Sequence, residues 1–88
     1  MQGLLRVSRT DLRAANHPTL HVFTAALEVD GAFVEELAVE RTTALHTGAA
    51  YAVLSEAKRE LERRGWCHVP LTQPVVCGKH EVVLAFTL

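Results

Sequence analysis

The alternation of apolar and polar residues between Leu20 and Arg41 is typical of a β-hairpin. In its first half, apolar residues occupy every second position and would share one face of a strand: Phe23, Ala25, Leu27 and Val29. Asp30-Gly31 suits the central positions of a type I′ turn, both of which need a positive φ. This turn would place Ala32 opposite Val29. Two residues further along, Val34 would lie opposite Leu27.

The alternation in the second half of this hairpin breaks at Glu35-Glu36 and resumes with Leu37 and Val39. One extra residue at the break, a β-bulge, would return Leu37 and Val39 to the face that carries Val34. A strand that ends at Glu35 is the alternative.

A helical pattern extends from Gly48 to Arg64. Apolar residues recur there at three- and four-residue spacings and form one stripe: Ala50, Val53, Leu54, Ala57 and Leu61. Thr47 is a candidate N-cap, and Gly65 stands where a left-handed residue ends many helices. Glu60 and Arg64 have the spacing of a stabilising ion pair on one helical face. The pattern predicts one long helix.

Shorter segments precede and follow these elements. Leu4–Val7 has the composition of a short strand, and Thr10–Asn16 has that of a turn of helix. After the helix, Trp66–Leu71 predicts a strand that Pro70 stops. The chain closes with an alternating strand over His80–Leu88.

The order of elements is therefore β-β-α-β-β, with an extra short strand in front. It predicts a single α+β domain over residues 1–88, with an antiparallel or mixed sheet of four to five strands and one long helix packed on one face. The strand order stays open, because the connection between the last two strands permits a hairpin without requiring it. The residues expected to face the helix are Phe23, Leu27, Val34, Leu37, Val39, Val82, Leu84 and Phe86.

One helix covers one face of such a sheet, and the second face is not cleanly polar. It would carry Leu20, Val22, Ala26, Phe33, Ala38 and Val83 among Thr24, Glu28 and Glu40. A solvated face alternates more strictly, and a contiguous apolar patch usually marks a partner surface. We therefore expect contact with a partner, through sheet faces or edges, at four residues: Leu20, Val22, Phe33 and Val83. The alternative is that residues 1–17 fold across this face.

Cysteine and histidine residues cluster near the C-terminus: Cys67, His68, Cys77 and His80. The two-residue gap between Cys77 and His80 is common in zinc sites. Strand neighbours point to opposite faces, so His68 would not join Cys67 at one ion. Zinc held by Cys67, Cys77 and His80 is one hypothesis. A Cys67–Cys77 disulfide, or a plain core position for Cys67, is the alternative.

The charges nearly balance, with nine Lys and Arg residues against ten Asp and Glu residues and a formal net charge of −1. This balance argues against a strongly basic arm that binds nucleic acid. Arg6, Arg9 and Arg13 lie close together in the sequence, so a weak nucleic-acid binder that uses them stays an alternative.

No catalytic arrangement stands out in the sequence. Ser55 has no histidine at a helical offset, and Glu35-Glu36 is typical of a solvated surface rather than an acid–base pair. The longest apolar run, Ala49–Leu54, is far shorter than the roughly 20 residues that span a bilayer. The first residues lack the basic region of a signal peptide, so we expect a cytoplasmic protein.

Together these patterns predict a small non-enzymatic protein-interaction module. It would homo-oligomerise, or dock on another protein, through an apolar sheet face. No cofactor is expected except in the zinc alternative at Cys67, Cys77 and His80.

Overall fold

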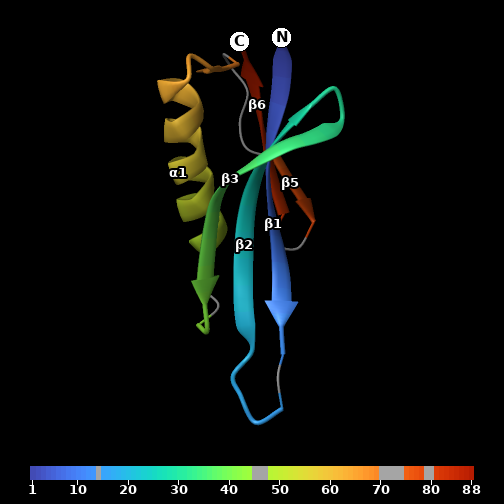
Figure 1. Cartoon of the computed structure of the whole chain (residues 1–88), viewed down its shortest axis with the longest axis vertical. Coiled ribbons are helices and arrows are strands. Elements are labelled where there is room, and N and C mark those ends of the chain that lie inside the picture. Colours follow the sequence, from blue (N-terminus) through green and yellow to red (C-terminus); the bar gives the residue numbers. More distant parts are fainter. Residues whose placement is uncertain (14, 45–47, 70–74, 79–80) are drawn as a thin grey trace.

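The computed structural model covers residues 1–88 and describes all of them except 14, 45–47, 70–74 and 79–80, with only the backbone described at 75–78. The described residues form six strands and one helix (Figure 1). These elements are β1 Gln2–Leu12, β2 Leu20–Val29, β3 Ala32–Thr42, α1 Ala49–Arg63, β4 Cys67–His68, β5 Val75–Gly78 and β6 Glu81–Thr87.

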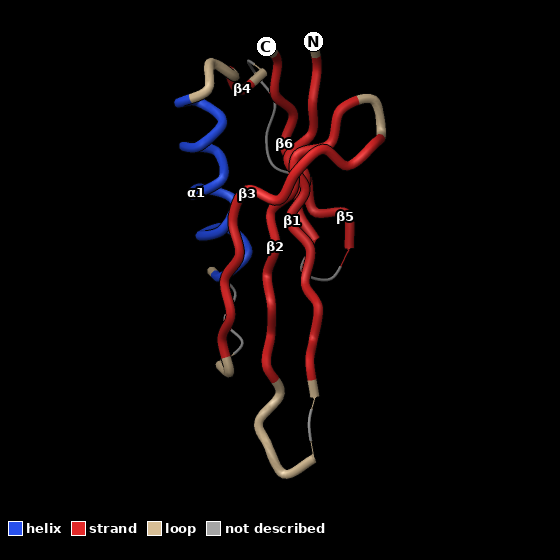
Figure 2. Tube along the Cα trace, in the orientation of Figure 1, coloured by secondary structure: helices blue, strands red, loops and turns tan. Residues whose placement is uncertain are grey.

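All strand pairs of the sheet are antiparallel, and the order is β3-β2-β1-β6. β4 and β5 pair with β6 one after the other, β4 near Thr87 and β5 near Glu81. They therefore share the fifth position of the sheet, and the helix packs against one face (Figure 2). The predicted α+β architecture is confirmed, while the short strand β5 was not predicted.

The N-terminal segment is a central strand of the sheet. β1 pairs with β2 from Gly3 to Leu12 and with β6 from Gln2 to Val7. The turn of helix predicted at Thr10–Asn16 is wrong at its start, because residues 10–12 continue the ladder with β2. The N-terminal segment is therefore a strand within the sheet and does not fold across the second face.

The turn of the β2–β3 hairpin forms as predicted, with φ of 54° at Asp30 and 79° at Gly31. Ala32 lies opposite Val29, also as predicted. Beyond that pair the ladder contains two irregularities instead of one bulge. Each inserts one residue into β3, Val34 in the first case and Leu37 in the second.

These two insertions change which residues of β3 face the helix. Glu35, not Val34, lies opposite Leu27, and the Val34 side chain is 51% exposed. Ala38 lies opposite Ala25 and is buried beneath the helix, so its assignment to the second face is wrong. Two further assignments are reversed by register: Glu40 pairs with Phe23 on the helix side, and Val39 pairs with Thr24 on the other side.

The helix begins and ends close to the predicted positions, and every residue of its predicted stripe is buried. Gly65 has a φ of 95° and ends it, as expected. Arg64 binds Glu60 on the helix, as predicted, and also Glu35 on β3. The candidate cap Thr47 lies outside the described residues.

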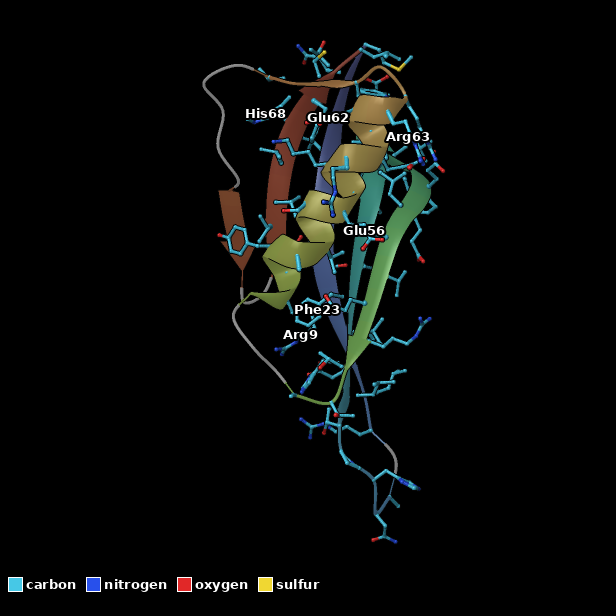
Figure 3. The ribbon with its side chains drawn as sticks, turned by 90° about the vertical axis from the view of Figure 1, so that its left-hand side faces the viewer. Arg9, Phe23, Glu56, Glu62, Arg63 and His68 are labelled. Atoms are coloured by element: carbon cyan, nitrogen blue, oxygen red, sulfur yellow. The ribbon has the colours of Figure 1, made fainter. Side chains whose placement is uncertain are left out.

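The core lies between α1 and the covered face of the sheet. Its largest fully buried side chains are Phe23, Phe86, Leu5, Leu61, Val7 and Val53. Phe23 lies beside the first turns of the helix (Figure 3). Among the described residues, no helix is long and apolar enough to cross a membrane.

Candidate functional site: the open face of the sheet

The face of the sheet away from α1 is called the open face here. Its residues alternate along each strand with the buried ones. Residues that lie opposite one another on neighbouring strands form rows across this face. From one end to the other, the rows contain Phe33, Glu28, Leu4 and Ala85; then Glu36, Ala26, Arg6 and Val83; then Val39, Thr24 and Ser8; then Arg41, Val22 and Thr10; and finally Leu20 and Leu12. Each row is named below by its β1 residue.

All four predicted partner-contacting residues lie on this face. Leu20, Val22 and Val83 are partly exposed, and Phe33 is 67% exposed. The structure does not gather them into one patch. Phe33 and Val83 belong to the Leu4 and Arg6 rows at one end, whereas Leu20 and Val22 lie at the other end, beyond the Ser8 row.

An ion-pair bridge occupies the centre of the first group. Arg6 Nε lies 3.0 Å from Glu28 Oε2 on β2, and Arg6 Nη1 binds Glu81 on β6. These hydrogen bonds raise the pKa of Arg6 above its usual value, and the one to Glu81 has a larger effect than the one to Glu28. This bridge was not predicted from the sequence, because its three residues are far apart in the chain and meet only through the β2-β1-β6 order.

A cleft of about 380 Å³ adjoins the Leu4 row, beneath the β2–β3 turn. Its lining includes Leu4, Ala85, Glu28 and Asp30. Among the described residues, its lining contains no serine, cysteine, histidine or lysine. Three of its lining residues, Leu4, Glu28 and Ala85, form part of the Leu4 row, so the cleft borders the open face.

Both edges of the sheet are interrupted. At one edge, the two inserted residues of β3 break its ladder with β2. At the other, Val69 donates to the carbonyl of Ala85, yet Val75 is already opposite Val83. β4 and β5 therefore pair with β6 as two separate strands. Interrupted edges are poor templates for pairing with another strand.

The candidate zinc ligands are not brought together by the backbone. Cys67 lies opposite Thr87, whereas Cys77 stands between Val76, opposite Val82, and Gly78, opposite Glu81. Five residues of β6 separate these positions, about 16 Å along a strand. This separation also exceeds the reach of a disulfide.

Cys67 itself is an exposed free thiol, so it does not occupy the core position considered for it. His80 lies outside the described residues. No group of three or more potential metal ligands occurs within the part of the chain that the structure describes.

The N-terminal arginines do not form a common surface. Arg6 is on the open face, and Arg9, opposite Phe23, is on the helix side. Arg9 Nε lies 3.2 Å from Asp11 Oδ1, and His21 Nδ1 lies 2.9 Å from the same oxygen. The hydrogen bond with His21 lowers the pKa of Asp11, and the charge of Arg9 acts in the same direction. Because Arg6 and Arg9 are paired with carboxylates, they have little free positive charge for binding phosphate.

Comparison with known proteins adds no assignment: no protein-family model, no curated protein and no solved structure matches this chain.

Proposed function

We propose that this protein is an interaction module that binds another protein chain through the open face of its sheet. One observation carries the proposal: α1 covers only one face, and every row of the other face contains at least one apolar side chain. Exposed hydrophobic residues grouped on one surface are typical of protein interfaces.

The face is a better interface than either edge. Strand addition requires a continuous row of free backbone groups, and β3 and the β4–β5 edge are both interrupted. The open face, in contrast, extends across β3, β2 and β1, with β6 added at the end that carries the Leu4 and Arg6 rows. In its central row two small polar residues, Ser8 and Thr24, lie beside Val39 and let a second layer approach closely.

Site-specific photo-crosslinking tests this proposal. Phe33 and Tyr51 are both exposed aromatic residues, at 67% and 47%, but Phe33 is on the open face and Tyr51 is on α1. Each would be replaced in turn by the photoreactive benzoylphenylalanine in cells that produce the protein. We expect a discrete protein adduct from position 33 and none from position 51.

A second substitution makes this test specific. Val22 lies on the open face at the far end from Phe33, so Val22→Asp would place a charge in the interface without touching the crosslinker. The adduct from position 33 should then be lost. A persistent adduct, or equal adducts from positions 33 and 51, would contradict the proposal.

A further inference from the structure

The open face is self-complementary about its central row. Leu4 and Leu12 lie on β1, each four residues from Ser8, and both are exposed, at 36% and 54%. Arg6 and Thr10 are each two residues from Ser8. A two-fold rotation about an axis across the strands at the Ser8 row would exchange the members of each pair.

The charges of β3 follow the same symmetry. Glu36 lies opposite Ala26, and Arg41 lies opposite Val22. Ala26 and Val22 flank Thr24, which belongs to the central row. Both charged side chains are exposed, and neither carries an ion pair within the described part of the chain. The same rotation would therefore place Glu36 of one copy over Arg41 of the other, twice.

We infer that a second copy of this chain covers the open face in an antiparallel, face-to-face dimer. In it, Leu4 packs over the partner's Leu12, and Glu36 pairs with the partner's Arg41 at both ends. This inference rests on the proposed function and names its partner. Two antiparallel sheets stacked in this way form an aligned sandwich, with the small central row allowing a spacing of about 10 Å.

The size of the face fits a weak dimer. Three strands, β3, β2 and β1, about 4.8 Å apart and over the nine residues from Leu4 to Leu12, give roughly 400 Å² per copy, because β6 reaches only as far as the Ser8 row. The total of roughly 800 Å² is in the range of weak, transient interfaces, which bury less than about 1,200 Å². We expect a dissociation constant on the order of 10–100 μM.

The Arg6 bridge supports this arrangement. Glu81 precedes Val82, which pairs with Val7, so it lies beside the Ser8 row and near its own copy across the axis. Two carboxylates there would repel each other. In each copy Arg6 binds Glu81 as well as Glu28, so its guanidinium offsets part of this repulsion.

Charge reversal gives a sharp test by sedimentation velocity. Glu36→Arg would set arginine against arginine at both ends, and Arg41→Glu would set glutamate against glutamate. Each variant alone should dimerise about tenfold more weakly or worse. An equimolar mixture of the two variants should restore the dimer, because every contact then joins an arginine to a glutamate.

Matched controls lie on the helix. Glu56→Arg and Arg59→Glu change the net charge by the same amounts at exposed positions of α1, and neither residue has an ion pair within the described chain. These variants should dimerise like the wild type. The restored dimer of the mixture also shows that both interface variants are folded.

Three results would overturn the inference: a wild type that stays monomeric at about 1 mM, charge variants that dimerise normally, or a mixture that stays monomeric. A monomeric wild type whose position 33 still crosslinks to a different protein would overturn the dimer alone. Loss of both the dimer and the specific adduct would overturn the proposed function as well.

Discussion

Arg6 Nε on β1 lies 3.0 Å from Glu28 Oε2 on β2, in the middle of the sheet face that the helix leaves open. The same guanidinium binds Glu81 on β6, so one residue links three adjacent strands. This bridge places three charged groups among the apolar residues of the face. It also gives the face a fixed charge pattern that a partner can match.

Removing this bridge should affect association more than folding. The side chains of Arg6 and Glu28 are 34% and 21% exposed, and ion pairs at such sites contribute about 1 kcal/mol or less to the free energy of unfolding. Arg6→Leu should therefore lower stability only slightly in urea denaturation, yet weaken the dimer. Arg63→Leu, which removes a helix-surface ion pair, is the control and should leave association unchanged. Equal dimerisation by both variants would contradict the role given to Arg6.

Leu4 and Leu5 are neighbours that point to opposite faces of β1. Leu5 is fully buried against the helix, so Leu5→Ala should lower the free energy of unfolding by about 2–5 kcal/mol. Leu4 is 36% exposed, and Leu4→Ala should cost about 1 kcal/mol or less while weakening self-association. Chemical denaturation and sedimentation of both variants check the assignment. A larger loss of stability for Leu4→Ala would show that the faces are reversed.

Gly3 is buried where β1 passes under Trp66. An added Cβ would lie 3.1 Å from Trp66 Cζ3 and 3.2 Å from the backbone oxygen of Glu28. Gly3→Ala should therefore lower the free energy of unfolding by about 1–3 kcal/mol through overpacking. Ser8→Ala, at an exposed position of the same strand, should change it by about 0.5 kcal/mol or less. Thermal or urea denaturation gives both values, and similar values would exclude this packing.

Asp11 predicts an acid-dependent loss of stability. Its hydrogen bond with His21 lowers its pKa in the folded state, so the carboxylate stabilises the fold above its unfolded pKa of about 4. This contribution disappears as the pH falls through the lower folded value. Asp11→Asn should thus be less stable than the wild type at neutral pH. The two proteins should be equally stable at a pH low enough to protonate Asp11 in both the folded and the unfolded wild type.

Urea midpoints measured at a series of pH values between about 7 and 2.5 follow this difference. Asp30→Asn is the control, since it removes a carboxylate from a turn position without an ion pair among the described residues. A constant difference between wild type and Asp11→Asn across the whole range would contradict the role of this pair.

The elements with strong periodicity could be predicted from the sequence. The stripe from Ala50 to Leu61 and the Asp30-Gly31 turn are local signals, because helix spacing and positive φ depend on nearby residues alone. The facing of the β3 residues was harder to predict, because each inserted residue moves every later side chain of the strand to the opposite face. One bulge was predicted where two occur, which is why Ala38, Val39 and Glu40 were placed on the wrong faces.

The candidate site depended on strand order, which the sequence could not supply. The even-numbered residues of β1 run along the middle of the open face because β1 lies between β2 and β6. A turn of helix was predicted over part of that strand, so Leu12 was not recognised as part of the surface. The symmetry of Glu36 and Arg41 also required the register of the β2–β3 ladder.

Methyl NMR spectra over a dilution series show whether the open face is the interface, because they observe each face of the sheet separately. We expect concentration-dependent shifts for the open-face methyl groups of Leu4, Val22 and Val83 between about 10 μM and 1 mM. The buried methyl groups of Leu5, Val53 and Leu61 should remain nearly unchanged over the same range. Shifts confined to α1 or to the strand edges, or no shifts from a protein that also yields no adduct at position 33, would contradict the open face as the interface.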